Sequence, residues 1–243
     1  MENDREQNAE IKAVIFDVDG TLVDSNDLHV EAWQRAFREY GKQVSREAIH
    51  EQIGKGGDQL MPEFCSREEL DRFGEELEKY RGEMFVREYL PRVRCFPRVR
   101  ELFERIKGDG LKTALASSAK EDEIAQHKKS LGIDRLVDGA TSADYVDSSK
   151  PDPDIFQAAL DGLKDIEPHE AIVVGDTPWD VIAARKTGVQ TIGVLSGGFT
   201  VDELRDAGAV EIYKDIADLL ENYDRSPLNR RRLAAACAEA RTE

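Results

Sequence analysis

Cysteine is scarce in this sequence and forms no recognisable binding pattern. The chain of 243 residues contains three, Cys65, Cys95 and Cys237, at wide spacing. Structural zinc sites and disulfide frameworks need closely spaced or regularly paired cysteines. We therefore expect neither device, and interpret the three thiols as buried or incidental.

Positive charge and long apolar segments are also lacking. Thirty-four lysines and arginines stand against 50 aspartates and glutamates, which gives a net charge of −16 and a pI near 4.8. A surface of this sign repels polyanions and argues against nucleic acids and anionic membranes as partners. No segment approaches the roughly 20 apolar residues that cross a bilayer, and the first ten residues do not resemble a signal peptide. These features predict a cytoplasmic protein.

The chain does contain an alternation of strand and helix patterns. Short apolar runs typical of buried strands lie at residues 13–16, 112–116, 171–174 and 191–194, with a weaker one near Ala140. Helical patterns follow most of them, as at residues 121–131 and 154–163. The alternation predicts an α/β fold with a doubly wound parallel sheet, in which ligands bind beyond the carboxyl ends of the strands.

Residues 27–90 interrupt this alternation with helical patterns alone. Apolar side chains recur there at helical spacing, for example at Leu28, Ala32 and Trp33, and no convincing strand is present. We interpret the segment as a helical cap domain inserted after the first strand. The predicted organisation is therefore a core at 11–26 and 91–223, a cap at 27–90, and terminal extensions at 1–10 and 224–243, the second with the basic run Arg230 to Arg232.

Four polar clusters fall where strands end, and together they predict a magnesium site. Neighbouring carboxylates cannot all ionise without a cation, and an oxygen-only ligand set favours magnesium over zinc. A lysine and a hydroxyl would add charge and donors suited to a phosphoryl group, and one carboxylate can act as a nucleophile through an aspartyl phosphate. The clusters are Asp17 with Asp19 and Thr21, Ser117 with Ser118, Lys150, and Asp176 with Asp180.

Each cluster alone has a simpler structural explanation. An Asp-x-Asp at a strand end is commonly a turn or a helix cap. Ser117 or Ser118 could cap the helix near Lys120, and Asp180 could cap the helix near Pro178. The occurrence of all four clusters in one order along the chain favours the functional interpretation.

That order and spacing resemble the four motifs of the haloacid dehalogenase-like hydrolases. The resemblance rests on Asp17-Val18-Asp19-Gly20-Thr21, Ser117, Lys150 and Gly175-Asp176 through Asp180, and covers residues 11–222. It implies a nucleophilic Asp17, and Asp19 as general acid and base whose main-chain carbonyl also binds the metal. It further implies that Ser117 and Lys150 bind the phosphoryl group, that Asp176 binds Mg²⁺ and that Asp180 orients the metal's water. Ser118, Gly20 and Thr21 complete the expected phosphate-binding set.

The resemblance also places a helical cap between the first and second motifs, in agreement with the pattern of residues 27–90. Cap closure would exclude water while the aspartate is phosphorylated, and opening would admit it for hydrolysis. In capped relatives the loop corresponding to Gly54–Asp58 faces the active site, which makes Lys55 a candidate for contacting the leaving group. His29 and Trp33 are interpreted as packing or hinge residues.

Asp19 argues against a true dehalogenase, since by resemblance those enzymes lack it and need no magnesium. We therefore expect a magnesium-dependent phosphatase acting on a small phosphorylated metabolite, such as phosphoglycolate or a sugar phosphate. A sugar phosphomutase similar to β-phosphoglucomutase is the main alternative, supported by His29 and Trp33. Two departures weaken it: the cap loop has no arginine, and the fourth motif has Asp176-Thr177 in place of adjacent acidic residues.

Three further points stay open at the level of sequence. A phosphonoacetaldehyde hydrolase would need a cap lysine for a Schiff base, and neither Lys42 nor Lys55 has a matching context. A catalytically silent binding or regulatory module would keep the fold without needing every motif residue. The protein could be a monomer or a homodimer.

Overall fold

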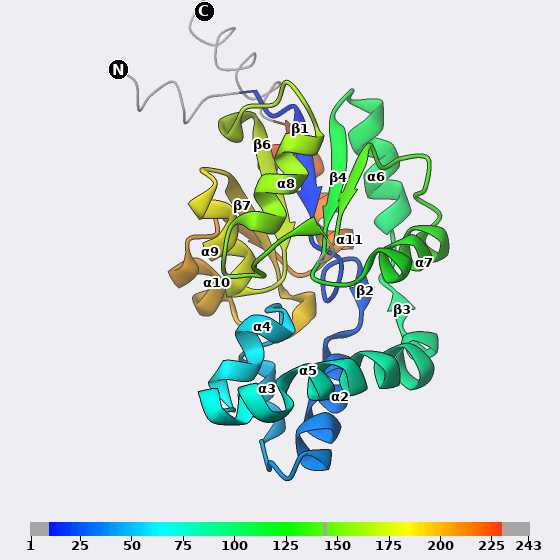
Figure 1. Ribbon diagram of the computed structural model, residues 1–243. Coiled ribbons are helices and arrows are strands. Elements are labelled where there is room, and N and C mark those ends of the chain that lie inside the picture. The colour runs from blue at the N-terminus through cyan, green and yellow to red at the C-terminus, as the bar shows by residue number, and fades with distance from the viewer. Residues whose placement is uncertain (1–9, 143–144, 230–243) are drawn as a thin grey trace, which may run out of the picture.

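A six-stranded parallel sheet forms the core of the protein. The computed structural model describes residues 10–142 and 145–229, and shows the core above a separate helical layer (Figure 1). Strand β1 lies in the middle of the sheet and pairs with β4 on one side and β6 on the other. In spatial order the strands are β5 (Gly139–Thr141), β4 (Lys112–Ala116), β1 (Ala13–Phe16), β6 (Ala171–Gly175), β7 (Gln190–Val194) and β8 (Glu211–Tyr213).

The register of the central strands aligns their carboxyl ends. Phe16, the last residue of β1, lies opposite Leu115 of β4 and Val174 of β6. Because the strands are parallel, the residues that follow them emerge at the same edge of the sheet. This edge faces the helical layer (Figure 1).

Helices cover both faces of the sheet, in agreement with the burial of all four residues of β1. Val14 and Phe16 pack on one side against α6 (Val99–Gly108), α7 (Glu121–Leu131) and α11 (Ile216–Glu221). Ala13 and Ile15 pack on the other side against α8 (Asp154–Gly162) and α9 (Pro178–Lys186). Helix α10 (Val201–Ala207) packs near α9 and β8. The predicted α/β fold is confirmed.

The helical layer has an apolar core of its own. Its helices are α2 (Asn26–Glu39), α3 (Arg46–His50), α4 (Gly57–Leu60) and α5 (Arg67–Met84), and α5 continues into a π-helical turn at Phe85–Tyr89. Trp33, Phe37, Leu77 and Phe85 are among its buried side chains. Ser66 begins α5 with a capping box to Glu69. We call this layer the cap.

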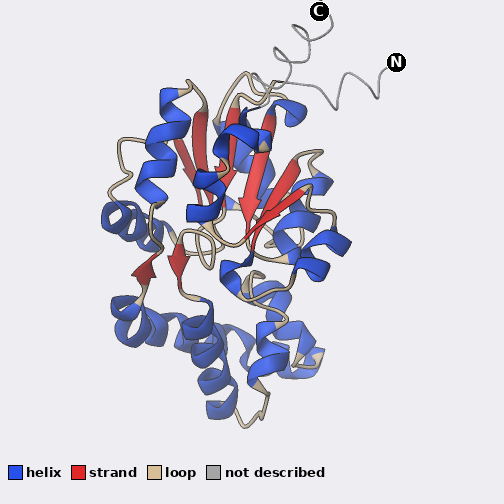
Figure 2. Ribbon diagram, turned by 180° about the vertical axis from the view of Figure 1, so that it is seen from behind, coloured by secondary structure: helices blue, strands red, loops and turns tan. Residues whose placement is uncertain are grey.

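Two short antiparallel strands connect core and cap. β2 (Val23–Asp24) leads out of the core and β3 (Arg94–Cys95) leads back, and the pair lies between the two layers (Figure 2). These two-residue strands, together with β8 and α10, are too short to give a periodic signal and were not predicted. The remaining short turns are 3₁₀ helices at Met61–Glu63, Leu90–Arg92, Pro168–Glu170, Leu195–Gly197, Tyr223–Arg225 and Pro227–Asn229.

Other expectations from the sequence can be checked in part. No helix among residues 10–142 and 145–229 is long and apolar enough to cross a membrane. Cys65 is buried and Cys95 is exposed, both as free thiols. Except for Glu10, the predicted leader at 1–10 lies outside the described residues, as does the C-terminal extension beyond Asn229 with its basic run.

Candidate active site

Three strands, one loop and one helix bring the predicted residues to one place. Asp17 directly follows β1, Ser117 follows β4 and Asp176 follows β6, so all three leave the sheet at the edge that faces the cap. Lys150 comes from the loop before α8, and Asp180 from the first turn of α9. All five side chains are buried.

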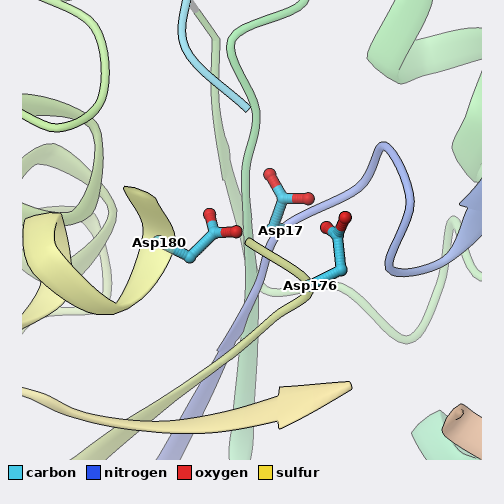
Figure 3. Close-up of side chains that lie close together, drawn as sticks. All are labelled: Asp17, Asp176 and Asp180. Carbon is cyan, nitrogen blue, oxygen red and sulfur yellow. The ribbon is translucent and has the colours of Figure 1, made fainter. Parts of the chain in front are cut away.

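Asp17, Asp176 and Asp180 form an acidic cluster. Each contributes one oxygen to a group whose members lie within 4.8 Å of one another, and their carboxyl groups point toward a common centre (Figure 3). The Lys150 ammonium, 1% exposed, bonds Asp17 and lies 2.7 Å from Asp180 Oδ1. One lysine against three carboxylates leaves a deficit of positive charge that a divalent cation with a preference for oxygen fits.

The pKa shifts in the cluster have the same origin. Burial raises the pKa of Asp17 to about 7, against the opposing Lys150 charge and with the help of Asp180. Burial, and then the charges of Asp17 and Asp180, raise the pKa of Asp176 well above its usual value. The two carboxylates raise the pKa of Lys150, which outweighs the effect of its burial. The cluster therefore favours a bound cation over three bare negative charges.

Asp180 has a structural role and a place in the cluster at once. Its Oδ2 accepts hydrogen bonds from Thr177 N at 3.0 Å and Thr177 Oγ1 at 2.7 Å, while its own N–H donates to Thr177 Oγ1 at 3.2 Å. This capping box begins α9. The other oxygen, Oδ1, faces Lys150. The helix-cap interpretation from the sequence is correct for Asp180, and it leaves one oxygen available to the site.

Asp176 is held by hydrogen bonds on both carboxylate oxygens. Thr21 Oγ1 donates to Oδ1 at 2.8 Å, and Asn26 Nδ2 donates to Oδ2 at 2.8 Å. A Cβ atom at Gly20 or at Gly197 would overlap the carboxyl group of Asp176, so glycine is required at both positions. The Thr21 hydroxyl proton thus goes to Asp176, whereas the sequence predicted a contact with phosphate.

The Asp19 carboxylate points away from the cluster toward the cap. Its Oδ1 accepts from Ser25 Oγ at 2.6 Å and lies 3.0 Å from His29 Nε2. Arg81 of α5 bonds His29 Nδ1, and since a guanidinium only donates, His29 is a neutral imidazole that donates through Nε2. Burial and the Arg81 charge accordingly lower the pKa of His29. Burial alone would raise the pKa of Asp19, but the contacts with His29 and Ser25 hold it well below its usual value.

The two serines after β4 have different surroundings. Ser117 Oγ accepts from Ala119 N at 3.0 Å and lies 3.5 Å from Asp19 Oδ2. Ser118 lines the cavity described next, and its buried hydroxyl has no hydrogen-bond partner among the described residues. The structure therefore gives Ser118, the more doubtful of the two in the sequence, the freer hydroxyl.

A cavity of about 600 Å³ separates the acidic cluster from the cap. Asp17, Asp19, Asn26 and Ser118 line it from the core side. The cap side carries both signs of charge, from Lys55, Glu75, Glu78, Lys79 and Arg81. The cavity has room for a small phosphorylated molecule with the phosphate beside Asp17.

Lys55 lies in the cap wall of the cavity, where it contacts the core. Its Nζ bonds Gln52 Oε1 at 2.6 Å and Glu63 Oε1 at 2.8 Å, and sits 4.1 Å from the centre of the Trp179 ring. Trp179 Nε1 in turn donates to the Glu51 carbonyl at 3.2 Å. Lys55 thus holds the cap loop against the residue next to Asp180, in addition to facing the cavity.

Sequence reasoning did not assign site roles to His29, Arg81 or Asn26. His29 stacks on Phe85 with ring centres 4.0 Å apart, which agrees with the packing role expected of it, but it also bonds Asp19. Arg81 follows Leu77 by four residues and so lies on the buried side of α5, an unusual place for a charge. This charged residue on an apolar helix face is the one feature of the sequence that could have identified Arg81 as a site residue.

Comparison with known proteins agrees with the motifs and the fold. The sequence model of the family described as haloacid dehalogenase-like hydrolase matches residues 14–194. The chain belongs to this family, and its fold and acidic cluster are those of a capped, phosphatase-like member. The buried aspartate triad is typical of the family's metal site, and the family is normally magnesium-dependent.

For several relatives, the match to this chain extends over nearly the whole length of the relative. A phosphorylated carbohydrates phosphatase of Thermotoga maritima is 30% identical over 205 residues, which is 84% of this chain and 94% of that protein. The pyrophosphatase PpaX of Oceanobacillus iheyensis is 26% identical over 86% of this chain and 95% of its own. The crystal structure of a hydrolase from Pseudomonas syringae superposes with a TM-score of 0.78, at 32% identity, over 88% of this chain and 98% of that one.

Proposed function

We propose that this protein is a magnesium-dependent phosphatase that hydrolyses a small phosphate monoester through a phosphorylated Asp17. The observation that carries the proposal is the buried cluster of Asp17, Asp176 and Asp180, with Lys150 bonded to two of them and with Asp17 lining the cavity between core and cap. Family membership and the phosphatase relatives support it.

The residues divide the reaction into two displacements. In the first, an Asp17 oxygen attacks phosphorus and the bond between phosphorus and the ester oxygen breaks, while Asp19 gives the leaving alkoxide a proton. To carry that proton, Asp19 must first give up the contacts with Ser25 and His29 that hold its pKa low. In the second, Asp19 takes a proton from water, the water oxygen attacks phosphorus, and the bond to Asp17 breaks. Phosphate leaves and both aspartates return to their initial state.

The other groups position and neutralise the phosphoryl oxygens. Lys150 supplies a fixed positive charge beside Asp17, and Ser117 and Ser118 supply hydroxyls from the end of β4. Asp17, Asp176 and Asp180 are the side chains that would hold Mg²⁺, together with the main-chain carbonyl of Asp19. When bound, the cation supplies charge neutralisation for the phosphoryl group.

The cavity favours a polar leaving group of modest size. About 600 Å³ accommodates a phosphorylated sugar, and the cap wall offers both carboxylates and ammonium groups for its hydroxyls. The relative from Thermotoga maritima is described as acting on phosphorylated carbohydrates. We therefore place sugar phosphates ahead of phosphoglycolate, whose single carboxylate would face Glu75 and Glu78.

Phosphate release from p-nitrophenyl phosphate and from a panel of sugar phosphates, phosphoglycolate and pyrophosphate tests the proposal. Wild type should release phosphate with Mg²⁺ and lose this activity with EDTA. Asp17→Asn should show no detectable hydrolysis, because an amide is not nucleophilic, whereas Asp27→Asn at an exposed position should match wild type. Activity retained by Asp17→Asn would refute the mechanism. Interconversion of hexose phosphates faster than phosphate release would favour the phosphomutase alternative.

A further inference from the structure

Asn26 begins the first cap helix and contacts two separate segments of the core, one at Asp176 and one at Gly197. It is the first residue of α2, two residues after the end of β2, and is 6% exposed. Its side-chain amide donates to Asp176 Oδ2 at 2.8 Å and to the Gly197 carbonyl at 3.1 Å. Those two partners are 150 and 171 residues away in the sequence, so only the folded chain brings the amide to them.

The orientation of the Asn26 amide follows from its partners. A carboxylate oxygen and a main-chain carbonyl both accept hydrogen bonds, so the NH₂ group must face them and Oδ1 must face away. Oδ1 is buried and has no hydrogen-bond partner among the described residues, while Asn26 lines the cavity beside Asp17. A buried acceptor left unpaired costs about 1–3 kcal/mol, so a donor at this place would stabilise the site.

We infer that Asn26 is a positioning residue for the metal site, an assignment that rests on the proposed magnesium-dependent function. Its NH₂ group fixes one oxygen of Asp176, while Thr21 fixes the other. Its free Oδ1 accepts a hydrogen bond from a water in the hydration shell of the cation. Mg²⁺ keeps several of its waters when it binds to proteins, so an acceptor next to the carboxylates suits it.

The same carbonyl links Asn26 to the cap. Gly197 O also lies 3.1 Å from His50 Nε2, and because a carbonyl only accepts, His50 donates to it. A side chain at position 197 would overlap both Asp176 and the Asn26 amide. His50 of α3 and Asn26 of α2 therefore meet on one core carbonyl, so the position of the cap and the orientation of Asp176 share this contact.

A purely structural role for Asn26 can be distinguished by experiment from a role in positioning the metal site. Ser25 occupies the N-cap position of α2, and the side chain of Asn26 bonds two core groups and none in its own helix. If Asn26 only stabilised the junction, its replacement would lower the melting temperature without changing the affinity for Mg²⁺. If it positions the metal site, the affinity for Mg²⁺ falls as well.

Calorimetric titration of the substrate-free protein with Mg²⁺ alone separates these two roles. Asn26→Ala and the milder Asn26→Ser should bind Mg²⁺ about 10–100-fold more weakly than wild type, the usual effect of removing a group that orients a metal ligand. Asn222→Ala is a matched control, since Asn222 Nδ2 also donates to an aspartate carboxylate and a carbonyl, both of Asp218 at 2.9 Å, far from the site. It should bind Mg²⁺ as wild type does.

Activity provides the second readout. The variants at Asn26 should need more Mg²⁺ for half-maximal hydrolysis of p-nitrophenyl phosphate, recover their kcat at high Mg²⁺, and keep the KM for substrate within about twofold. Folded Asn26 variants with wild-type Mg²⁺ affinity would overturn the inference and leave the phosphatase proposal standing. Weaker Mg²⁺ binding by the variants of a protein that releases no phosphate would support the inference and refute the phosphatase proposal.

Discussion

The two walls of the cavity are built on opposite principles. On the core wall, Asp17 lines the cavity and is 5% exposed, and its cluster neighbours Lys150 and Asp176 are 1% and 0% exposed. All three bond to one another or to neighbouring side chains. On the cap wall, Glu75, Glu78 and Lys79 are exposed, while the Lys55 side chain is 6% exposed and is held by partners in the cap and by Trp179. Charges interact strongly in a buried site and weakly where water screens them. The proposed function therefore assigns the chemistry to the core wall and the choice of leaving group to the cap wall.

Among the variants that compare the two walls, the largest effect is expected on the core side at Lys150. Lys150→Met leaves Asp17 and Asp180 without their cation, and removal of one partner of a buried pair costs about 3–5 kcal/mol of unfolding free energy. We expect kcat with p-nitrophenyl phosphate to fall about 10²–10³-fold, as when one group that stabilises transition-state charge is removed. Lys186→Met, which removes a half-exposed lysine paired with Asp152, is the control. A loss of less than tenfold at Lys150 would contradict the role given to the core wall.

The core wall should also make stability depend on pH and on Mg²⁺. Asp17 has a raised pKa of about 7 in the folded protein against an ordinary value of 3.8, so the folded state binds more protons between these two values. Stability without divalent cations should therefore fall as pH rises through this window. Mg²⁺ at a hundred times its Kd should restore about 2.7 kcal/mol, or roughly 5–10 °C in melting temperature.

Thermal scans at pH 5 and pH 8, with EDTA or with Mg²⁺, check this expectation. The gain from Mg²⁺ should be larger at pH 8, because at pH 5 protons compete with the cation for the carboxylates. Na⁺ at matched ionic strength is the control for general screening. An equal gain at both pH values would show that the acidic cluster does not hold the cation.

The smallest effect is expected on the cap wall at Lys55. Lys55→Met removes the contact with Trp179 and the pair with Glu63, interactions worth about 0.5–2 kcal/mol in total at such sites. We expect kcat/KM for the best sugar phosphate to change by at most about tenfold, and p-nitrophenyl phosphate hydrolysis by less than twofold. Lys107→Met, at an exposed pair with Asp138, serves as control. An equal loss on both substrates would mean that Lys55 acts on the chemistry, and the two walls would no longer differ in kind.

Much of the fold followed from the sequence because its signals are local. The buried strands at 13–16, 112–116 and 171–174 are continuous apolar runs, and the observed strands lie within one residue of them. The longer cap helices α2 and α5 followed from periodic spacing in the same way, whereas α4 begins in the Gly54–Asp58 stretch that was expected to be a loop. Strands β2 and β8 were missed, since two or three residues carry no period and their pairing depends on partners distant in the chain.

The sequence by itself predicted which groups would carry the proposed chemistry: Asp17, Asp19, Lys150 and Asp176 stand at the ends of patterned elements, and parallel strands deliver such ends to one edge. Only the tertiary structure decided their partners. It turned Thr21 and Asn26 toward Asp176, and it placed His29 against Asp19 with Arg81 behind it. These contacts join residues from 10 to 155 positions apart. A hydrogen bond between distant residues depends on how the layers pack, and spacing along the chain does not encode it.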